Sequence, residues 1–420
     1  MMNVGILTIG DELLIGQVVN TNASSIASAC TSAGARVTVQ STVADGIETI
    51  VAELRRLVDS DLDAIITTGG LGPTHDDYTM KAVATFLQVD IVSDPQWLQH
   101  LEKWMSSLGR DLSSRNAAQA LVPRGAAVFY SSVGTAPGFS VLVPTNRGTC
   151  MLFVLPGVPR EMQTLMDAEV VPWVGRAIEE NYEEVTEYHT LLSVGIPESA
   201  LADLLGNPDS FLRGGTLAFL PSTSGIRLRI GVTGKGQSVR TDEIHRIEQY
   251  IRERAGAWII GDANATLQET VGARLLQMQA TVSVAESCTG GMLGGAFTDV
   301  PGSSAWFEGG VITYSNHAKV RDLGVLESAL LEHGAVSSQV AEQMAAGVRQ
   351  RFGTTYGIGV TGVAGPDGGS AEKPVGTVWI AVANKGNVIS QQHLFTNNRK
   401  ANRERSVTAA LLLLWQNLES

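Results

Sequence analysis

A serine in a turn of small residues is the first candidate for chemistry. Ser287 stands in Ala285-Glu286-Ser287-Cys288-Thr289-Gly290-Gly291, after a run from Thr281 to Ala285 that predicts a strand and before an apolar helical pattern. A serine at a strand-to-helix turn presents its Oγ, and the amides that follow can form an oxyanion hole at the helix start. Ser287 is therefore a candidate nucleophile.

The base that would activate Ser287 is not part of an ordinary triad. The GxSxG pattern of serine hydrolases is absent, and the seven histidines are dispersed, with no His and Asp at a recognisable triad spacing. A lysine with a lowered pKa is a chemically sound alternative. We interpret Cys288 as a small packing residue rather than a reactive thiol.

A second segment supplies a lysine. Val311 to Tyr314 predicts a strand, at whose end Tyr314, Asn316 and Lys319 could be presented. Taken alone, Lys319 would more often be a solvated surface lysine and Tyr314 a half-buried strand residue. Spacing along the chain does not show whether these side chains converge on Ser287.

The loop from Thr361 to Gly376 is rich in glycine and proline, and we interpret it as a substrate cover. Gly357, Gly359 and Gly362 match GxGxxG, but they fall in a strand pattern that leads into Gly-Pro, so the dinucleotide-binding interpretation fails. Ser370 to Lys373 matches SxxK, yet its surroundings cannot start the helix that such a pair requires.

A different chemistry is indicated by the turn from Thr68 to Thr79. Gly69, Gly70 and Gly72 let backbone amides approach an anion ahead of a helix N-terminus. The adjacent carboxylates of Asp76 and Asp77 would repel a phosphate unless a divalent cation lay between them, which favours metal-assisted binding of a phosphoryl ligand. The alternative is that one of the two aspartates caps the helix.

Further polar residues follow the first predicted strand, Val4 to Ile9. Asp11 and Glu12 would lie at the same sheet edge as the glycine turn if the first and third strands are parallel neighbours. Asn20-Thr21-Asn22 indicates a helix entry with amides free to bind hydroxyls, but an ordinary N-cap at Asn20 or Thr21 is the stronger explanation.

These residues are positioned by alternating strands and helices, which predict an α/β fold with a mostly parallel sheet and ligands beyond the carboxyl ends of its strands. The expected N-terminal elements are strands at 4–9, 37–43 and 62–68, helices at 21–33, 47–58 and 79–87, a hairpin at 138–155, and a helix from Pro159 to about Val174.

The chain is expected to divide into three units. From about Asn181 to Gly256 the strands are short (216–220 and 226–233) and the helix at 240–254 is strongly amphipathic, which predicts a small α+β unit. A new αβ series follows, with a helix at 266–277, a strand at 281–285 and a final helix at 402–418. We set the boundaries at 1–172, 173–260 and 261–420.

Composition narrows the function. The 420 residues carry 30 Lys+Arg and 42 Asp+Glu, a formal charge of −12, which argues against a general binder of nucleic-acid backbones. No apolar run approaches a membrane span, and Asp11 and Glu12 interrupt any signal peptide, so we expect a soluble cytoplasmic protein. The three cysteines are too few and too scattered for a disulfide framework or a structural zinc site.

The motifs together resemble the bacterial competence/damage-inducible protein CinA family over essentially the whole chain. The resemblance rests on Ile9 to Asn22, the turn from Gly69 to Thr79, Gly134-Thr135-Ala136-Pro137-Gly138-Phe139, Leu155-Pro156-Gly157-Val158-Pro159-Arg160-Glu161-Met162, Glu286 to Gly291, Gly302 to Lys319 and Thr361 to Gly376. It implies a molybdopterin-binding-like three-layer αβα domain, a small KH-like α+β domain and a C-terminal α/β deamidase domain.

The resemblance also implies activities. The N-terminal domain would cleave ADP-ribose with a divalent metal ion, and the C-terminal domain would convert nicotinamide mononucleotide to nicotinic acid mononucleotide and ammonia without a cofactor. By motif position Ser287 falls on the nucleophile and Lys319 on its base, with Tyr314 and Ser304 as supporting polar residues. The expected oxyanion and substrate contacts are Thr289, Gly290, Gly291, Asn316, Gly365 and Arg399; the phosphate contacts are Gly69, Gly70, Gly72, Thr74 and Asn22; and the metal ligands are Asp76 and Asp77.

Three positions depart from the family pattern. Phe395-Thr396-Asn397-Asn398-Arg399 replaces a Phe-x-Gly-Asp-Arg-like stretch, which leaves the substrate contact of Arg399 open; Ser132 stands where Asn is usual, and Pro197 interrupts a glycine-containing stretch. We expect nucleotide ligands, a homodimer, and neither membrane nor nucleic-acid partners. A non-catalytic nucleotide- or molybdopterin-binding accessory protein linked to DNA uptake stays open as the alternative.

Overall fold

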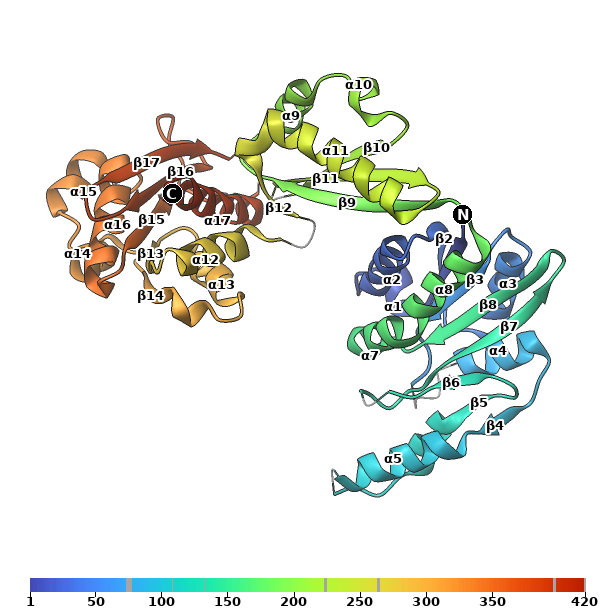
Figure 1. Ribbon diagram of the computed structural model, residues 1–420. Coiled ribbons are helices and arrows are strands. Elements are labelled where there is room, and N and C mark those ends of the chain that lie inside the picture. Colours follow the sequence, from blue (N-terminus) through green and yellow to red (C-terminus); the bar gives the residue numbers. More distant parts are fainter. Residues whose placement is uncertain are drawn as a thin grey trace. The chain divides into compact units, whose positions relative to one another are not determined.

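The computed structural model describes residues 1–72, 78–107, 109–131, 133–222, 225–262, 265–395 and 398–418 (Figure 1). These residues form two compact units. The first consists of residues 1–188 with 232–243, and the second of residues 189–231 with 244–420.

The N-terminal domain is built on a six-stranded sheet in the order β2-β1-β3-β8-β7-β6. The four strands β2, β1, β3 and β8 run parallel, and β7 and β6 add an antiparallel hairpin edge. The parallel pairing of β1 with β3 confirms the neighbourhood that the sequence required for a shared site. The strands are β1 (Asn3–Ile9), β2 (Arg36–Val43), β3 (Ala64–Thr68), β6 (Ala127–Phe129), β7 (Gly138–Thr145) and β8 (Gly148–Leu155).

Helices cover both faces of this sheet, because β1 alternates its buried side chains between them. Val4 and Ile6 pack in one core with α2, α7 and α8, whereas Leu7 and Ile9 pack in another with α3 and α4. The result is the expected three-layer αβα domain. The helices of these layers are α1 (Asp11–Leu14), α2 (Thr21–Ser32), α3 (Ile47–Val58), α4 (Thr79–Leu87), α7 (Pro159–Leu165) and α8 (Val171–Asn181).

The helix expected from Pro159 to about Val174 is longer and interrupted. A π-helical segment, Met166–Val170, separates α7 from α8, which ends at Asn181. Pro172 lies at the start of α8 and has no amide hydrogen, so the regular hydrogen-bond ladder cannot pass through it. The sequence pattern also did not predict a smaller group of elements: β4 (Ile91–Ser93), α5 (Pro95–Ser107), α6 (Ser114–Ala117), the 3₁₀ turn η1 (Ala118–Ala120) and β5 (Leu121–Pro123).

The middle domain is the expected small α+β unit, with a four-stranded sheet in the order β10-β11-β9-β12. Its helix α11 buries Ile244, Ile247, Ile251 and Ala255, the stripe that its amphipathic pattern predicts. Its elements are β9 (Val185–Ser193), α9 (Glu198–Leu205), α10 (Asp209–Leu212), β10 (Thr216–Ser222), β11 (Gly225–Gly234), α11 (Gln237–Ala255), the 3₁₀ turn η3 (Gly256–Trp258) and β12 (Ile259–Asp262).

The C-terminal domain is an α/β unit on a five-stranded sheet in the order β14-β13-β15-β16-β17. The first three strands are parallel and the last two antiparallel. Helices α12, α13 and α17 contribute to the core on one face, and α16 packs against the other.

The strands of this domain are β13 (Val282–Glu286), β14 (Phe307–Ile312), β15 (Tyr356–Gly362), β16 (Thr377–Ala383) and β17 (Val388–Leu394). Its helices are α12 (Leu267–Gln277), α13 (Met292–Thr298), the 3₁₀ turn η4 (Ser303–Ala305), α14 (Asn316–Leu323), α15 (Glu327–His333), α16 (Ser338–Phe352) and α17 (Arg399–Gln416).

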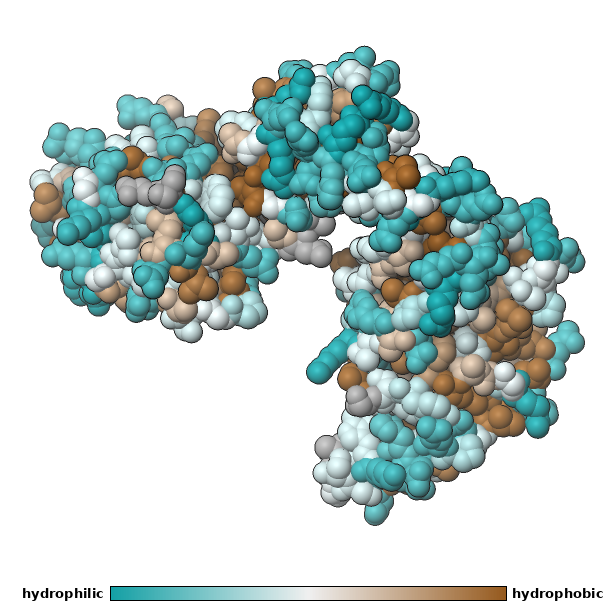
Figure 2. Space-filling model, viewed as in Figure 1, coloured by the Kyte–Doolittle hydropathy of each residue, from teal (hydrophilic) through white to brown (hydrophobic). Residues whose placement is uncertain are grey.

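Hydrophilic and neutral residues make up most of the face of each part that Figure 2 shows, with hydrophobic residues in smaller groups. Within the described residues, every helix is too short or too polar to cross a membrane. Cys30, Cys150 and Cys288 are buried free thiols.

Candidate active sites in the two α/β domains

Ser287 lies directly beyond the carboxyl end of β13, in the middle of the C-terminal sheet. Its amide donates to the carbonyl of Val360 on β15 at 3.0 Å, which fixes the backbone where the two parallel strands end. The residue is buried, with 8% of its surface exposed. The strand expected to precede the serine therefore positions it, as the sequence indicated.

Lys319 reaches Ser287 from α14. The Oγ of Ser315 caps this helix by accepting from the amide of Ala318 at 3.1 Å, which places Lys319 in the first turn. The Nζ of Lys319 lies 3.1 Å from the Oγ of Ser287 and donates to the carbonyl of Thr313 at 2.7 Å. Two side chains separated by 32 residues in sequence thus form one hydrogen-bonded pair.

The surroundings of Lys319 increase the neutral fraction of its amine. Lys319 is 1% exposed, and burial lowers its pKa from 10.5 to about 8. Among the described residues, no carboxylate forms an ion pair with Lys319 that would restore its charge. The adjacent Cys288 responds in the opposite way, because burial raises the pKa of its thiol to about 11 and keeps it protonated. The amine can therefore accept a proton from Ser287 near neutral pH, while the thiol stays inert.

The turn after Ser287 divides its amides between two tasks. The buried carboxylate of Glu286 accepts from Gly291 at 2.9 Å, from Leu293 at 3.1 Å and from Gly294 at 2.8 Å, and so caps α13. The Gly291 amide is consequently engaged by a carboxylate and is not available to an oxyanion, because an amide with one hydrogen already donates it.

The amides of Thr289 and Gly290 are oriented by Arg403 on α17. Its Nε donates to the carbonyl of Cys288 at 3.1 Å and its Nη2 to that of Thr289 at 2.7 Å. In a trans peptide the N–H points opposite to the C=O, so the N–H groups of Thr289 and Gly290 are directed away from the guanidinium. The hydroxyl of Thr289 is buried and has no hydrogen-bond partner among the described residues.

The remaining expected residues of this site are only partly brought together. Arg399, the first residue of α17, donates from Nη1 to the carbonyl of Gly365 at 2.7 Å, which joins two of them. Tyr314 is 66% exposed, and Asn316 and Ser304 are exposed. In the described part of the chain none of these three hydrogen-bonds to Ser287 or Lys319.

Sequence reasoning missed Arg403 and Asn402. The side-chain Nδ2 of Asn402 donates to the carbonyl of Ala364 at 3.1 Å, beside the contact that Arg399 makes with the same loop. The signal that could have found both residues is helical spacing, since positions three and four beyond Arg399 share its face of α17.

The N-terminal domain holds a cavity of about 310 Å³ at the carboxyl ends of β1 and β3. Gly69, Gly70 and Asn22, three of the expected phosphate contacts, line it. The side-chain amide of Asn22 donates to Thr68 Oγ1 at 3.1 Å and to the carbonyl of Gly157 at 2.8 Å. Its Oδ1 is buried and unpartnered among the described residues, and is therefore open to a donor.

Two glycines of this cavity occupy positions that a residue with a side chain would take only under strain. Gly69 has φ +112° and a Cβ there would lie 2.1 Å from the carbonyl oxygen of Ile9, while Gly70 has φ +65° and a Cβ there would lie 2.3 Å from Thr79 Oγ1. Gly72 is exposed and is not part of the described lining. Thr74, Asp76 and Asp77 lie outside the described residues.

Carboxylates from other segments face this cavity as well. Glu12, whose role the sequence left open, and Asp45, which sequence reasoning missed, both line it. Asp45 follows β2, and its Oδ2 accepts from the amide of Asp11 at 2.9 Å. No local motif marks Asp45, because only the parallel pairing of β1 with β2 brings it here.

The fold and these sites define a three-part protein of the molybdopterin-binding-like, KH-like and CinA C-terminal class. Residues 5–176 match the family described as a probable molybdopterin binding domain, residues 188–261 the damage-inducible protein CinA KH domain, and residues 264–418 the CinA C-terminal domain.

Relatives that match nearly the whole chain carry the same family name. A CinA-like protein of Gemmatimonas aurantiaca is 41% identical over 98% of this chain and 95% of its own length, and one of Salinibacter ruber is 41% identical over 98% of each chain. A crystal structure of competence/damage inducible protein CihA from Agrobacterium tumefaciens is 41% identical over 36% of this chain and 96% of that chain, with a TM-score of 0.35. The chain belongs to the CinA family.

Proposed function

We propose that this chain is a bifunctional pyridine-nucleotide salvage enzyme of the cytoplasm, whose C-terminal domain deamidates nicotinamide mononucleotide. The observation that carries the proposal is the 3.1 Å contact between Lys319 Nζ and Ser287 Oγ, made by a buried amine whose pKa is lowered to about 8. A neutral amine at this distance is a general base for a serine nucleophile.

The reaction would proceed through an acyl-enzyme. Ser287 Oγ attacks the carboxamide carbon while Lys319 takes the hydroxyl proton, and the N–H groups of Thr289 and Gly290 stabilise the negative oxygen. The C–N bond then breaks, and Lys319 gives the proton to the leaving nitrogen, which departs as ammonia. Water, activated by the same amine, hydrolyses the ester and frees nicotinic acid mononucleotide.

Replacing Ser287 with Ala tests this assignment. We expect Ser287→Ala to abolish ammonia release from nicotinamide mononucleotide with the fold retained, because no other described hydroxyl hydrogen-bonds to Lys319. Ser338→Ala, on α16 of the same domain, is the matched control and should keep wild-type turnover. Undiminished ammonia release by Ser287→Ala would refute the mechanism.

We propose further that the N-terminal domain cleaves ADP-ribose to AMP and ribose 5-phosphate with a divalent metal ion. The proposal is supported by the cavity of about 310 Å³, the open Oδ1 of Asn22 and the carboxylates of Glu12 and Asp45 on its wall. Oxygen donors of this kind suit a hard divalent cation, so the residues present fit the ion. Such an ion, held with help from Asp76 and Asp77, would polarise the pyrophosphate for attack by water.

A double substitution tests this second activity. Asp76→Ala with Asp77→Ala should remove chelator-sensitive cleavage of ADP-ribose while ammonia release continues. The control is Asp111→Ala, an exposed carboxylate of the same domain. Persistent metal-stimulated cleavage in the double variant would contradict the placement of the ion, and copurified pterin would favour the molybdopterin-binding alternative.

A further inference from the structure

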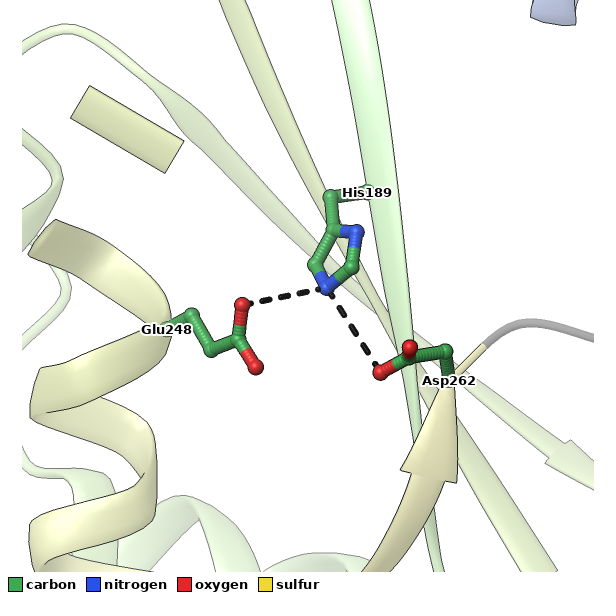
Figure 3. Close-up of side chains that lie close together, drawn as sticks. All are labelled: His189, Glu248 and Asp262. Atoms are coloured by element: carbon green, nitrogen blue, oxygen red, sulfur yellow. Dashed lines mark ion pairs between the residues drawn. The ribbon is translucent and has the colours of Figure 1, made fainter. Parts of the chain in front are cut away.

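Three potential metal ligands meet in the middle domain, and none of them belongs to either proposed site. Figure 3 shows the imidazole of His189 between the carboxylates of Glu248 and Asp262. His189 lies on β9, Glu248 on α11 and Asp262 at the end of β12. Asp262 pairs with Leu191 across the antiparallel strands, so it shares a sheet face with His189, two residues earlier on β9.

The spacing of the ligand atoms suits one small ion. His189 Nε2 lies 3.3 Å from Glu248 Oε2 and 3.9 Å from Asp262 Oδ1, and all three atoms lie within 4.8 Å of one another. Donors about 2.1 Å from a tetrahedral ion lie roughly 3.4 Å apart, close to these separations. The three side chains need little rearrangement to share an ion.

The position of His189 Nε2 between two carboxylates favours a positive charge at this point. Its Nε2 is buried and makes no hydrogen bond within the described residues, although two carboxylate oxygens face it. A neutral Nε2 would direct its lone pair at negative oxygens, which is repulsive in a partly buried environment. Either a proton or a metal ion must occupy the space between them.

Arg252 offsets part of the negative charge of the two carboxylates and leaves the space between the three ligand atoms free. Its Nε contacts the other oxygen of Glu248, Oε1, at 2.7 Å, and its Nη2 lies 3.6 Å from Asp262 Oδ1. The two carboxylates and this guanidinium sum to a formal charge of −1, which favours a cation among them. Arg252 is 42% exposed and Asp262 68%, so the guanidinium can leave Asp262 and still hold Glu248 as an outer partner of the ion.

We infer that His189, Glu248 and Asp262 form a binding site for a divalent first-row transition metal ion, separate from the ion proposed for the N-terminal domain. One imidazole nitrogen with two carboxylates is a donor set for ions such as Zn²⁺, Co²⁺ or Ni²⁺, whereas Mg²⁺ and Ca²⁺ prefer oxygen alone. Water would complete the coordination on the exposed side of Asp262.

The ion would stabilise the end of β12, where the chain passes from the middle domain to the C-terminal domain. Leu192 on β9 and Ile260 on β12 belong to the same buried core as Val271 and Leu275 of α12, in the C-terminal domain. Joining Asp262 to β9 and α11 would hold the end of β12 where the chain leaves the middle domain. Metal binding should therefore raise the thermal stability of the unit that contains these residues.

The test is Co²⁺ binding to the full chain carrying Asp76→Ala and Asp77→Ala, which removes the proposed N-terminal ligands from the measurement. We expect one equivalent of Co²⁺, seen as visible d–d absorption, with a rise in melting temperature that a hundredfold excess of Mg²⁺ leaves in place. Adding His189→Ala should remove both signals. His245→Ala, an exposed histidine one turn earlier on α11, is the matched control and should change neither.

A second substitution keeps the test informative if His189→Ala does not fold. Asp262→Asn changes an exposed side chain and should weaken Co²⁺ binding at least tenfold with the circular dichroism spectrum unchanged. Unaltered Co²⁺ absorption in either variant would overturn the inference, as would the absence of Co²⁺ binding in the parent, which would leave Arg252 and a proton as the balancing cations.

Discussion

The cavity of the N-terminal domain and the Ser287 turn of the C-terminal domain are built on the same plan. Each begins where a central parallel strand ends, β3 or β13, and continues through glycines with positive φ. Gly69 and Gly70 have φ +112° and +65°, and Gly290 and Gly291 have φ +59° and +94°. The backbone alone would therefore suggest two similar anion-binding turns.

Their charges are opposite, and this difference separates their chemistry. Carboxylates line the N-terminal cavity at Glu12 and Asp45, so an anionic ligand needs a cation there. The C-terminal turn lies beside the buried amine of Lys319. The buried carboxylate of Glu286 caps α13 by accepting from three backbone amides. The side chains brought in from neighbouring elements, and not the glycine turns, therefore distinguish the metal-assisted chemistry proposed for one site from the nucleophilic chemistry proposed for the other.

The largest expected effect comes from removing the amine that distinguishes the C-terminal site. Lys319→Met should lower kcat for ammonia release by about 10²–10⁴, because a general base typically contributes that much. ADP-ribose cleavage should be unchanged. Lys319→Arg is the informative control, since it keeps a cation but cannot be deprotonated near neutral pH. An active Lys319→Met enzyme would show that the buried amine does not distinguish the chemistry of the C-terminal site from that of the N-terminal site.

The same variant has a signature in stability. Because the pKa of Lys319 is lowered to about 8 in the folded state from 10.5, the unfolded chain binds more protons between these values. The free energy of unfolding of the wild type should therefore rise as the pH increases from about 8 to 10.5. Lys319→Met should lack this rise, which denaturant titration at several pH values would reveal.

A smaller loss is expected from releasing the clamp on the oxyanion amides. Arg403→Met frees the carbonyls of Cys288 and Thr289, so the amides of Thr289 and Gly290 lose their fixed direction. Kcat should fall by up to about 10² with little change in KM, because these amides act mainly in the transition state. Arg403→Lys keeps one donor and should be intermediate; equal losses in kcat and affinity would indicate a general disruption of the turn instead.

The pH dependence should differ between the two activities by a still smaller factor. With a pKa of about 8, the neutral fraction of Lys319 increases roughly fiftyfold between pH 6 and pH 8. The kcat/KM for ammonia release should rise with a slope near one well below the pKa, bend near pH 8 and level off above it. A flat profile would mean that a group other than Lys319 limits the reaction.

Sequence reasoning found the parts of both sites that are local and missed those that depend on tertiary pairing. The buried runs and glycine turns predicted β1, β3, β13 and the residues directly after them, because hydrophobic periodicity and turn chemistry are encoded in short segments. Lys319 was one of several candidates at the end of a predicted strand, and its role as the base came from the family resemblance, since nothing in its own helix distinguishes it from a surface lysine until its burial is seen.

The residues that the sequence did not predict reach their sites only through tertiary contacts. Asp45 reaches the N-terminal cavity only because β2 runs parallel to β1, and Arg403 reaches the Ser287 turn across 114 residues of chain. The expectation that Gly291 is an oxyanion donor overlooked Glu286, whose side chain reads as one more buried strand position until it is seen to accept three amides.

The smallest effect is expected from a substitution in the glycine turn of the N-terminal cavity. At Gly69 an alanine Cβ would meet the carbonyl oxygen of Ile9 at 2.1 Å and would also have to adopt φ +112°, whereas at Gly125 the cost is limited to φ +86° because nothing lies within 4 Å. Gly125→Ala should therefore lower the free energy of unfolding by about 1 kcal/mol and Gly69→Ala by more, on the order of 2–3 kcal/mol. Both can be measured by urea denaturation. Ammonia release should be the same in the two variants, and only Gly69→Ala should impair ADP-ribose cleavage; equal stability of the two would show that the turn beside Ile9 can shift, and that close packing does not define this site.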